Sequence, residues 1–493
     1  MEFKQRINVS GYRGIWGETL TKEVVILYTR AFVSFLKEKK GNPTILIGRD
    51  GRESGPEIKE IILNELKNLG VEGIDGDILP TPTVLFSVRK HGYTGGIIIT
   101  ASHNPIEYNG LKFINDKALF TIKEEVDTIN KYYEEEIKEF ERIREENIAS
   151  GSITQDDGPS TSKKSSKILL RADGSNILLE NPDNESSENP SNITPNFLKE
   201  HADKILANVN VEAIRAKKFK VVADMINASA CVMDPYLFEQ LGVEIVPINN
   251  IPNGKFGHRP EPLRENLLET EKIAIESGVD VGFVHDPDAD RLVLINEKGE
   301  VISEEFSIAL AIENILSKNP GKPIVLNLST SQRGADIAKK YGSECFRTKI
   351  GEGFVVEGML THNAIIGGEG NGGIIYPTIN TVRDSFTGLA LILELLAERN
   401  KTVSELVAEI PQYIIKKDKW PIGNNLSEIY AKLKSKLPEA KTDEQDGIRF
   451  DFPDNSWIHL RPSNTEPIIR LFGEAKNQER IDELFEEAKK VIL

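Results

Sequence analysis

The residues with the clearest potential for chemistry form the stretch Thr100-Ala-Ser-His-Asn-Pro105. It follows Ile97-Ile-Ile99, a β-branched run typical of a strand that is buried on both faces. The small and polar residues and the proline that come next predict a loop. Open α/β sheets bind ligands just beyond the carboxyl ends of their strands, so Ser102 is a candidate nucleophile. For the pair Ser102-His103 considered alone, an ordinary turn serine is the alternative.

A second motif, Asp286-Pro-Asp-Ala-Asp-Arg291, follows another apolar run. Three carboxylates this close together repel one another unless a hard cation neutralises them. Oxygen ligands with open positions favour Mg²⁺. A solvated acidic turn is the alternative, but such turns rarely follow a buried strand and carry an arginine. We therefore predict that Asp286, Asp288 and Asp290 bind a metal ion.

The third motif, Gly368-Glu-Gly-Asn-Gly-Gly373, places one carboxylate and one amide among four glycines. Glycines allow a ligand to approach the backbone closely, and Glu369 with Asn371 would then hold adjacent hydroxyls of a sugar. The spacing is not the dinucleotide-binding fingerprint, because the helix and the later acidic residue of that motif are missing. Considered alone, the motif is equally consistent with a structural turn.

The fourth motif, Arg461-Pro-Ser-Asn-Thr-Glu-Pro-Ile-Ile-Arg470, combines guanidinium groups, hydroxyls and an amide around a tight loop. Guanidinium forks and hydroxyl or backbone donors suit a phosphate group, with a plain surface turn as the alternative. The candidate phosphate ligands are Arg461, Ser463, Asn464, Thr465 and Arg470. Together, the four motifs predict phosphoryl transfer on a sugar phosphate.

Alternating strands and helices are expected to position these motifs. The first part of the chain predicts a helix at 22–40, a strand at 44–48, a helix at 55–69, the strand before Ser102 and a charged helix at 121–148. Later segments predict strands at 220–224, 280–285, 323–327, 364–367 and 468–472, and helices at 228–241, 306–316, 334–340 and from 385 to about 399. Such alternation indicates parallel or mixed sheets covered by helices.

Composition limits the function classes. At about 150 residues per domain, 493 residues suggest three or four domains. The net charge of −16, with no basic stripe, argues against nucleic acid as a partner. The two cysteines are far apart and fit a reducing cytoplasm. Because the N-terminus is polar and no apolar run approaches the roughly 18 residues that span a membrane, we expect a cytoplasmic protein without a membrane partner.

In their types and order, the four motifs resemble those of the α-D-phosphohexomutase family. The resemblance covers the chain except residues 149–195, which are polar and rich in Ser, Asn and Pro and predict a flexible insert. It implies an α/β fold with four domains around a central cleft: three similar α/β units with mixed sheets and a smaller C-terminal α+β domain. We expect these domains at 1–148, 196–298, 299–410 and 411–493, with the insert after the first.

The resemblance also implies a reaction. Ser102 would be carried as phosphoserine and complete the shell of one Mg²⁺ per chain with the three aspartates. The phosphoserine would give its phosphoryl group to a hexose monophosphate, and the resulting bisphosphate would reorient and return its other phosphate. A hexose bisphosphate would prime the serine, and the phosphate loop would hold the phosphate that is not reacting.

By motif position, Arg13 and Lys112 resemble the cationic residues beside the reacting phosphate, which are candidates for proton transfer or charge support. His103 either supports the loop or touches phosphate. Arg291 and Lys349 resemble substrate contacts. Glu352, also placed on the substrate side, stands where some family members carry a histidine, so the resemblance leaves one acid/base group open.

The sugar is the least determined part of the substrate. Asn371 stands where many relatives that act on neutral hexoses carry serine, and an Asn-Gly pair resembles some amino-sugar mutases. This favours phosphoglucosamine mutase, with a bispecific phosphomannomutase/phosphoglucomutase as the alternative. Two hypotheses assign a different class of function: a Mg²⁺-dependent sugar-phosphate phosphatase, and a sugar-phosphate-binding protein without catalytic activity. The expected partner is a hexose phosphate, and the expected assembly is a monomer or a homodimer.

Overall fold

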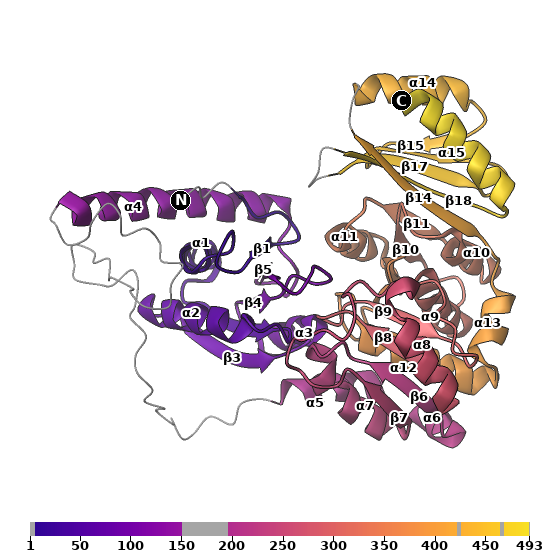
Figure 1. Ribbon diagram of the computed structural model, residues 1–493, viewed down its shortest axis with the longest axis horizontal. Helices are drawn as coiled ribbons and strands as arrows, with labels where there is room; N and C mark the ends of the chain where they lie inside the picture. The colour runs from indigo at the N-terminus through magenta and orange to yellow at the C-terminus, as the bar shows by residue number, and fades with distance from the viewer. Residues whose placement is uncertain (1–4, 150–195, 422–424, 464–467, 493) are drawn as a thin grey trace. The chain divides into compact units, whose positions relative to one another are not determined.

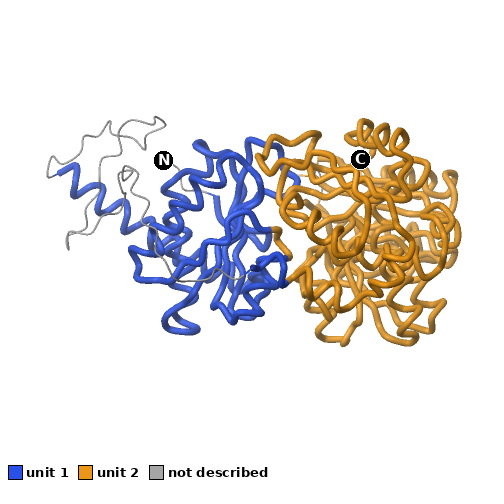
Figure 2. The backbone as a smooth tube through the Cα atoms, turned by 90° about the horizontal axis from the view of Figure 1, so that it is seen from below, with its two compact units in different colours: residues 1–79, 83–200 blue, residues 80–82, 201–493 orange. Residues whose placement is uncertain are grey.

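The computed structural model describes residues 5–149, 196–421, 425–463 and 468–492 (Figure 1). The chain forms two compact units (Figure 2): residues 1–79 with 83–200, and residues 80–82 with 201–493. Within the described ranges, no helix is both long and apolar enough to cross a membrane. The central cleft stays a prediction.

The first unit is built on a mixed five-stranded sheet of order β1-β5-β4-β2-β3. Its strands are β1 (Tyr12–Ile15), β2 (Thr44–Arg49), β3 (Glu72–Ile78), β4 (Gly95–Ile99) and β5 (Tyr108–Ile114). Strand β2 is parallel to β3 and β4, whereas β5 is antiparallel to β4 and β1. All five residues of β4 are buried, as its β-branched run predicts.

Four helices belong largely to this sheet: α1 (Lys22–Lys40), α2 (Gly55–Asn68), α3 (Thr81–His91) and α4 (Lys123–Ala149). Helix α1 begins after Thr21, whose hydroxyl accepts from Val24 N, and ends at Gly41 with φ of +67°. The ring of Tyr28 on α1 stacks on Tyr133 of α4, with the centroids 3.8 Å apart. This aromatic contact lies in the main core of the unit, which also secures β1 and β5.

The second unit holds three sheets (Figure 1). Two of them have four strands, in the orders β7-β6-β8-β9 and β11-β10-β12-β13. Their strands are β6 (Lys220–Asp224), β7 (Glu244–Ile248), β8 (Val281–His285), β9 (Leu292–Ile295), β10 (Ile324–Asn327), β11 (Cys345–Thr348), β12 (Ile366–Glu369) and β13 (Gly373–Ile375). In both sheets three strands are parallel and the last is antiparallel.

These sheets are flanked by helices and short 3₁₀ turns. They are α5 (Phe197–Leu206), α6 (Val211–Lys217), η1 (Ser229–Val232), α7 (Asp234–Leu241), η2 (Arg264–Asn266), α8 (Leu268–Ser277), α9 (Glu305–Lys318), α10 (Gln332–Lys340), α11 (Glu352–His362), α12 (Ser385–Arg399) and α13 (Val403–Glu409). Helix α5 crosses from the first unit to the second at residue 200. Helices α9 and α12 are buried along most of their length, which explains their high content of Leu, Ile and Ala.

A repeat that sequence similarity only suggested is clear in the topology. The orders β3-β2-β4-β5, β7-β6-β8-β9 and β11-β10-β12-β13 are the same, with the same strand directions. In each repeat the third and fourth strands form an antiparallel pair joined by a loop. The prediction of three similar α/β units with mixed sheets is confirmed.

The C-terminal part has a different fold, an antiparallel sheet of order β14-β18-β17-β16-β15. It comprises β14 (Ile414–Pro421), β15 (Lys441–Asp443), β16 (Ile448–Asp451), β17 (Trp457–Pro462) and β18 (Ile468–Ala475), with α14 (Leu426–Lys436) and α15 (Gln478–Ile492). The helices and one face of the sheet share a core of buried aliphatic and phenylalanine side chains. The predicted smaller α+β domain is confirmed.

Some element predictions were wrong in detail. The helix expected at 228–241 is divided into η1 and α7, because Pro235 starts a new helix rather than continuing one. The strand expected at 364–367 runs over β12, so it includes Glu369. Arg461, expected in a loop, lies on β17. The predicted insert lies outside the described residues apart from Ala149, the last residue of α4.

Candidate active site

Ser102 lies in the loop between β4 and β5, beyond the carboxyl end of β4. Its backbone φ is +49°, a left-handed conformation that is uncommon for a serine. The Ser102 N–H donates to Thr100 Oγ1 over 2.9 Å, and the Ser102 hydroxyl lies 3.3 Å from His103 Nδ1. The serine is therefore held in a specific, strained turn, which is typical of functional loops.

The main support of this loop is Arg52, a fully buried residue that follows β2. Its guanidinium donates four hydrogen bonds of 2.7–2.8 Å to loop carbonyls, at positions Ser102, Asn104, Pro105 and Tyr108. Its Nε donates to Asp50 Oδ2 over 3.1 Å. The same carboxylate oxygen accepts from Thr100 Oγ1, so one buried ion pair organises both ends of the turn.

Arg13 and Lys112 belong to neighbouring strands of the same sheet. Arg13 on β1 pairs in register with Gly110 on β5, and its Nη1 donates to Asn104 Oδ1 over 2.8 Å. Lys112 is two residues further along β5 and is buried, with its Nζ 5.5 Å from the centroid of Phe120. A Cβ on Gly110 would lie 2.2 Å from Tyr12 O, so glycine is required for this close pairing of β1 and β5.

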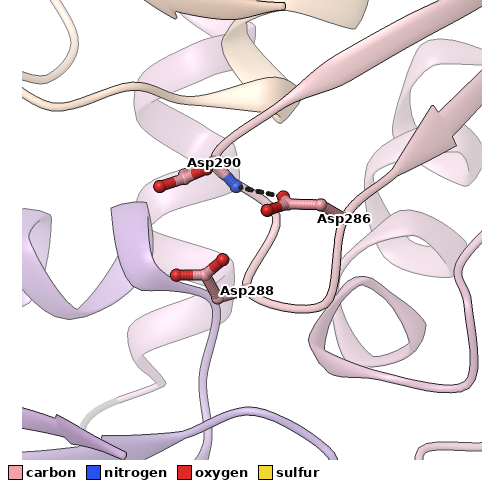
Figure 3. Close-up of side chains that lie close together, drawn as sticks. All are labelled: Asp286, Asp288 and Asp290. Carbon is pink, nitrogen blue, oxygen red and sulfur yellow. Dashed lines mark hydrogen bonds between the residues drawn. The ribbon is translucent and has the colours of Figure 1, made fainter. Parts of the chain in front are cut away.

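The three aspartates occupy the loop between β8 and β9 and are buried, with exposures of 0–1%. Figure 3 shows their side chains gathered on one side of the loop. Each offers a carboxylate oxygen within 4.8 Å of the other two. Burial, and then the charges of Asp290 and Asp288, raise the pKa of Asp286 well above its usual range. A divalent cation would relieve this repulsion, so the all-oxygen donor set fits a hard metal ion.

Hydrogen bonds from neighbouring serine residues to backbone carbonyls hold the aspartate loop in place. Ser229 donates its N–H and its hydroxyl to Pro287 O, and Ser385 Oγ donates to Ala289 O over 2.7 Å. Ser385 Oγ also lies 2.9 Å from Nδ1 of His285, the last residue of β8. The aspartate loop is thus fixed by side chains from both four-stranded sheet regions.

Glu369 ends β12, and residues 370–372 of its motif form the loop to β13. Its Oε1 accepts from Asn327 Nδ2 and from Gly351 N, and its Oε2 accepts from Arg383 Nη1 over 3.0 Å. Asn371 Oδ1 accepts from the N–H of Gly373 over 3.2 Å. The Glu369 carboxylate is therefore oriented by three donors before any ligand binds.

Arg383 is the residue that sequence reasoning missed in this region. Besides Glu369, its guanidinium contacts Glu352 Oε2 over 3.2 Å and pairs with Asp290. Its own N–H donates to Glu352 Oε1 over 2.7 Å. Although burial disfavours the charge, the carboxylates of Asp290, Glu352 and Glu369 raise the pKa of Arg383. It connects the aspartate loop, the start of α11 and the end of β12.

The remaining candidates for substrate contacts are Arg291, Lys349 and Glu352. Arg291 follows the third aspartate, and its Nε is 3.8 Å from Asp290 Oδ1. Lys349 is exposed just after β11, with its Nζ 5.5 Å from the centroid of Phe354. Glu352, the first residue of α11, is engaged by Arg383 as described.

Cationic residues line up across the C-terminal sheet. Arg461 on β17 pairs in register with Arg470 on β18, which in turn pairs with Lys419 on β14. Like charges directly opposite on neighbouring strands destabilise a sheet, and an anion bound on that face would offset the repulsion. Ser463 N donates to Ile468 O over 2.8 Å. Asn464 and Thr465 lie outside the described residues.

Three of the four sequence motifs therefore occupy equivalent positions in the repeated sheets. Ser102, the three aspartates and the residues after Glu369 occupy the same loop of the three repeats, between the third and fourth strands. Arg52, Arg383 and Lys419 were missed because their roles depend on partners far away in the sequence. The only signals were an arginine just beyond the strand β2 and an arginine just before a long helix.

Comparison with known proteins agrees with this organisation. Four family models match: "Phosphoglucomutase/phosphomannomutase, alpha/beta/alpha" domain I at residues 4–140, domain II at 199–299 and domain III at 304–413, and the C-terminal domain at 425–491. Together they extend over most of the chain and include all four motifs.

Two relatives match along nearly the whole length. A phosphoglucomutase/phosphomannomutase of Thermococcus kodakarensis is 34% identical over 97% of this chain and 96% of its own. A phosphoglucosamine/phosphogalactosamine mutase of Sulfurisphaera tokodaii is 32% identical over 98% of both. The crystal structure of a phosphoglucomutase/phosphomannomutase family protein from Burkholderia thailandensis has the same fold, with a TM-score of 0.75, 24% identity and coverage of 99% and 98%.

The fold and these relatives define an enzyme of the mutase class. The chain belongs to the α-D-phosphohexomutase family. Its fold and its order of motifs are those expected from the sequence.

Proposed function

We propose that the enzyme interconverts hexose 6-phosphates and hexose 1-phosphates through a phosphoserine at Ser102 and a bound hexose bisphosphate. The observation that carries the proposal is the equivalence of the three loops in the repeated sheets. Ser102, the three aspartates and the loop after Glu369 each occupy the same connection, between the third and fourth strands of a repeat. A fold that repeats one loop position can supply several parts of one reaction without changing its core.

In the first half-reaction, the bond between Ser102 Oγ and phosphorus breaks as a sugar hydroxyl oxygen forms a bond to the same phosphorus. The hydroxyl proton passes to a basic group of the enzyme, and the serine oxygen takes up a proton. In the second half-reaction the Ser102 hydroxyl gives its proton to a basic group, and Ser102 Oγ forms a bond to the phosphorus of the other phosphate as the bond from that phosphorus to the sugar oxygen breaks. The released sugar oxygen takes up a proton. A Mg²⁺ ion held by the three aspartates would neutralise charge on the transferring group.

Other residues bind and orient. We assign Arg13, Lys112 and His103 to the reacting phosphate. Arg13 donates to Asn104 of the serine loop, His103 lies in that loop beside the Ser102 hydroxyl, and Lys112 lies on the adjoining strand. We assign the sugar hydroxyls to Glu369 and Asn371 and further substrate contacts to Arg291, Lys349 and Glu352.

The phosphate that is not reacting is assigned to the loop of Arg461, Ser463, Asn464, Thr465 and Arg470. Guanidinium groups bind phosphate through parallel hydrogen bonds.

For the sugar, we favour glucosamine phosphate. Asn371 in its Asn-Gly pair supports this choice, as does the Sulfurisphaera relative named phosphoglucosamine/phosphogalactosamine mutase. The Thermococcus relative named phosphoglucomutase/phosphomannomutase supports the bispecific alternative. We further propose a cytoplasmic monomer or homodimer, activated by hexose bisphosphate, with domains at 1–148, 196–298, 299–410 and 411–493.

The test is a panel of isomerisation assays with glucosamine 6-phosphate, mannose 1-phosphate and glucose 1-phosphate, each with Mg²⁺ and a trace of hexose bisphosphate. Inorganic phosphate is measured in the same tubes. We expect isomerisation of glucosamine 6-phosphate at the highest kcat/KM and no net release of phosphate. Release of phosphate without an isomer would identify a phosphatase and contradict the proposal.

A further inference from the structure

Each aspartate of the metal-binding loop has one carboxylate oxygen already held by a donor of the chain. Asp286 Oδ1 accepts from the N–H groups of Asp290 and Arg291, both over 3.1 Å. Asp288 Oδ2 accepts from Thr81 Oγ1 over 2.8 Å. Asp290 Oδ2 accepts from Arg383 Nη2. These four donors are of three kinds, namely backbone N–H groups, a hydroxyl and a guanidinium, and at each aspartate they hold one carboxylate oxygen.

We propose that Thr81 and Arg383 set the metal selectivity of the enzyme by holding Asp288 and Asp290 as ligands through one oxygen each. Mg²⁺ requires octahedral geometry at about 2.0–2.1 Å, whereas Ca²⁺ takes about 6–8 oxygens at longer distances and often binds both oxygens of a carboxylate. A set of single-oxygen ligands therefore suits the smaller ion. The inference rests on the metal site of the proposed function and adds its two selectivity residues.

The hydroxyl of Thr81 is well placed to hold its oxygen. Thr81 is fully buried, and its N–H donates to Asp288 O over 3.0 Å. The backbone and the side chain of Thr81 therefore both donate hydrogen bonds to Asp288. The next residue, Pro82, accepts a hydrogen bond from Asn380 Nδ2 through its carbonyl over 2.7 Å. These contacts fix the segment that carries the hydroxyl.

Arg383 is equally restrained. It is 8% exposed, and Nε and Nη1 are bound to Glu352 and Glu369, so Nη2 is directed at Asp290 by two independent ion pairs. A buried guanidinium with these partners cannot turn away without leaving carboxylates unpaired, which is costly. The second oxygen of Asp290 is therefore kept from joining the metal shell.

The test compares divalent-ion binding by titration calorimetry on the full-length chain, with Mg²⁺, Mn²⁺ and Ca²⁺ as the probes. Thr81→Val removes the hydroxyl at nearly constant volume, and Thr81→Ser keeps it as a matched control. Arg383→Gln removes the guanidinium, and Arg399→Gln makes the same change at the other end of α12. Thermal unfolding without metal verifies that each variant is folded.

We expect the wild type to bind Mg²⁺ and Mn²⁺ more tightly than Ca²⁺. In Thr81→Val and Arg383→Gln the ratio of Ca²⁺ affinity to Mg²⁺ affinity should rise about tenfold, because a carboxylate becomes able to bind through both oxygens. Thr81→Ser and Arg399→Gln should keep the wild-type ratio. If Arg383→Gln is unfolded, the ratio of Ca²⁺ affinity to Mg²⁺ affinity in Thr81→Val tests the proposal by itself.

An unchanged ratio in a folded Thr81→Val protein, or in a folded Arg383→Gln protein, contradicts the role of that residue. If the wild type isomerises hexose phosphates with Mg²⁺ while the ratios stay constant, only this inference fails. If the wild type binds none of the three ions, the metal site of the proposed function fails, and the inference fails with it.

Discussion

The guanidinium of Arg52 donates to the carbonyl of Ser102 over 2.7 Å, and both residues are buried in the first unit. This bond is one of four that Arg52 makes to the serine loop, in addition to its ion pair with Asp50. A lysine has three donors on one nitrogen and cannot reach this spread of acceptors. The backbone of the proposed nucleophile is thus fixed by a side chain from the loop that follows β2.

We therefore predict that Arg52→Lys lowers kcat about 100-fold with a much smaller change in KM, because positioning of the reacting group affects the chemical step. Steady-state isomerisation and intact-mass measurement of phosphoserine occupancy test this. Arg30→Lys is the control, since Arg30 is another buried arginine of this unit, paired with Glu65. Equal losses in the two variants would mean that Arg52 acts only through overall stability.

The sequence predicted the four motifs, the strand before Ser102 and the helices α1, α2, α9 and α12, because these depend on local composition and periodicity. It could not predict the supports of the motifs. Arg52 and Ser102 are 50 positions apart, Thr81 and Asp288 are 207 apart, and Arg383 and Asp290 are 93 apart. Such partners become visible only when the topology brings their strands and loops together.

The location of Glu369 was also beyond local reasoning. Gly368-Glu-Gly read as a loop, since glycines weaken strands, yet pairing with β10 and β13 extends β12 to Glu369. Tertiary pairing outweighed local propensity here. As a result the carboxylate stands on a rigid strand end instead of a loop.

The buried residue Glu305 predicts a loss of stability as the pH rises from about 4.5 to about 8. Burial raises its pKa to about 8 from the ordinary 4.5, and its Oε2 accepts from Ser331 N over 2.9 Å. Between these two pH values the folded state binds more protons than the unfolded state, so stability falls as pH rises through that range. Glu305→Gln, which stays neutral, should be more stable than wild type at pH 9 by on the order of 2–5 kcal/mol.

Thermal or denaturant unfolding of both proteins at pH 5 and pH 9 measures this difference. Glu304→Gln is the matched control, because Glu304 is the neighbouring residue and pairs with Lys417 near the surface. A difference between Glu305→Gln and wild type that is the same at both pH values would contradict the assignment.

The buried residue His459 predicts that the stability of the protein depends on pH in the opposite direction in the acidic range. Burial lowers its pKa to about 4 from 6.5, and its ring bonds Ser329 Oγ over 3.0 Å and Asp446 O over 2.6 Å. Below pH 6.5 His459 binds a proton in the unfolded state but stays neutral in the folded state, so the protein loses stability as the pH falls from 6.5 towards 4. The loss should reach on the order of 2–3 kcal/mol.

His459→Gln keeps a donor and an acceptor but does not titrate. We expect the stability of this variant to change less than that of wild type between pH 7 and pH 4.5, as followed by urea unfolding with tryptophan fluorescence. Parallel losses in the two proteins would show that His459 does not contribute to the acid sensitivity.

The row formed by Arg461, Arg470 and Lys419 predicts a response to anions. Since like charges opposite one another destabilise a sheet, Arg470→Met should raise the melting temperature in the absence of phosphate. The same change should raise KM for hexose phosphate about tenfold, because a charge-assisted hydrogen bond to the phosphate is lost. Lys419→Met should act in the same direction but less strongly.

Melting curves with and without inorganic phosphate, and steady-state kinetics, check both effects. Lys434→Met on α14 serves as a surface control, because its partner is the exposed Glu444. If Arg470→Met leaves KM unchanged, or if phosphate stabilises it as much as wild type, the cationic row is not the phosphate site.

The most direct test of the central claim is to follow the phosphoryl group on Ser102. The enzyme is incubated with glucose 1,6-bisphosphate and Mg²⁺, desalted and analysed by intact and peptide mass, then mixed with hexose monophosphate. We expect one phosphoryl group on Ser102, complete transfer to the sugar as bisphosphate, and neither event in Ser102→Ala. Isomerisation that persists in Ser102→Ala, or a phosphoryl group on another residue, would contradict it.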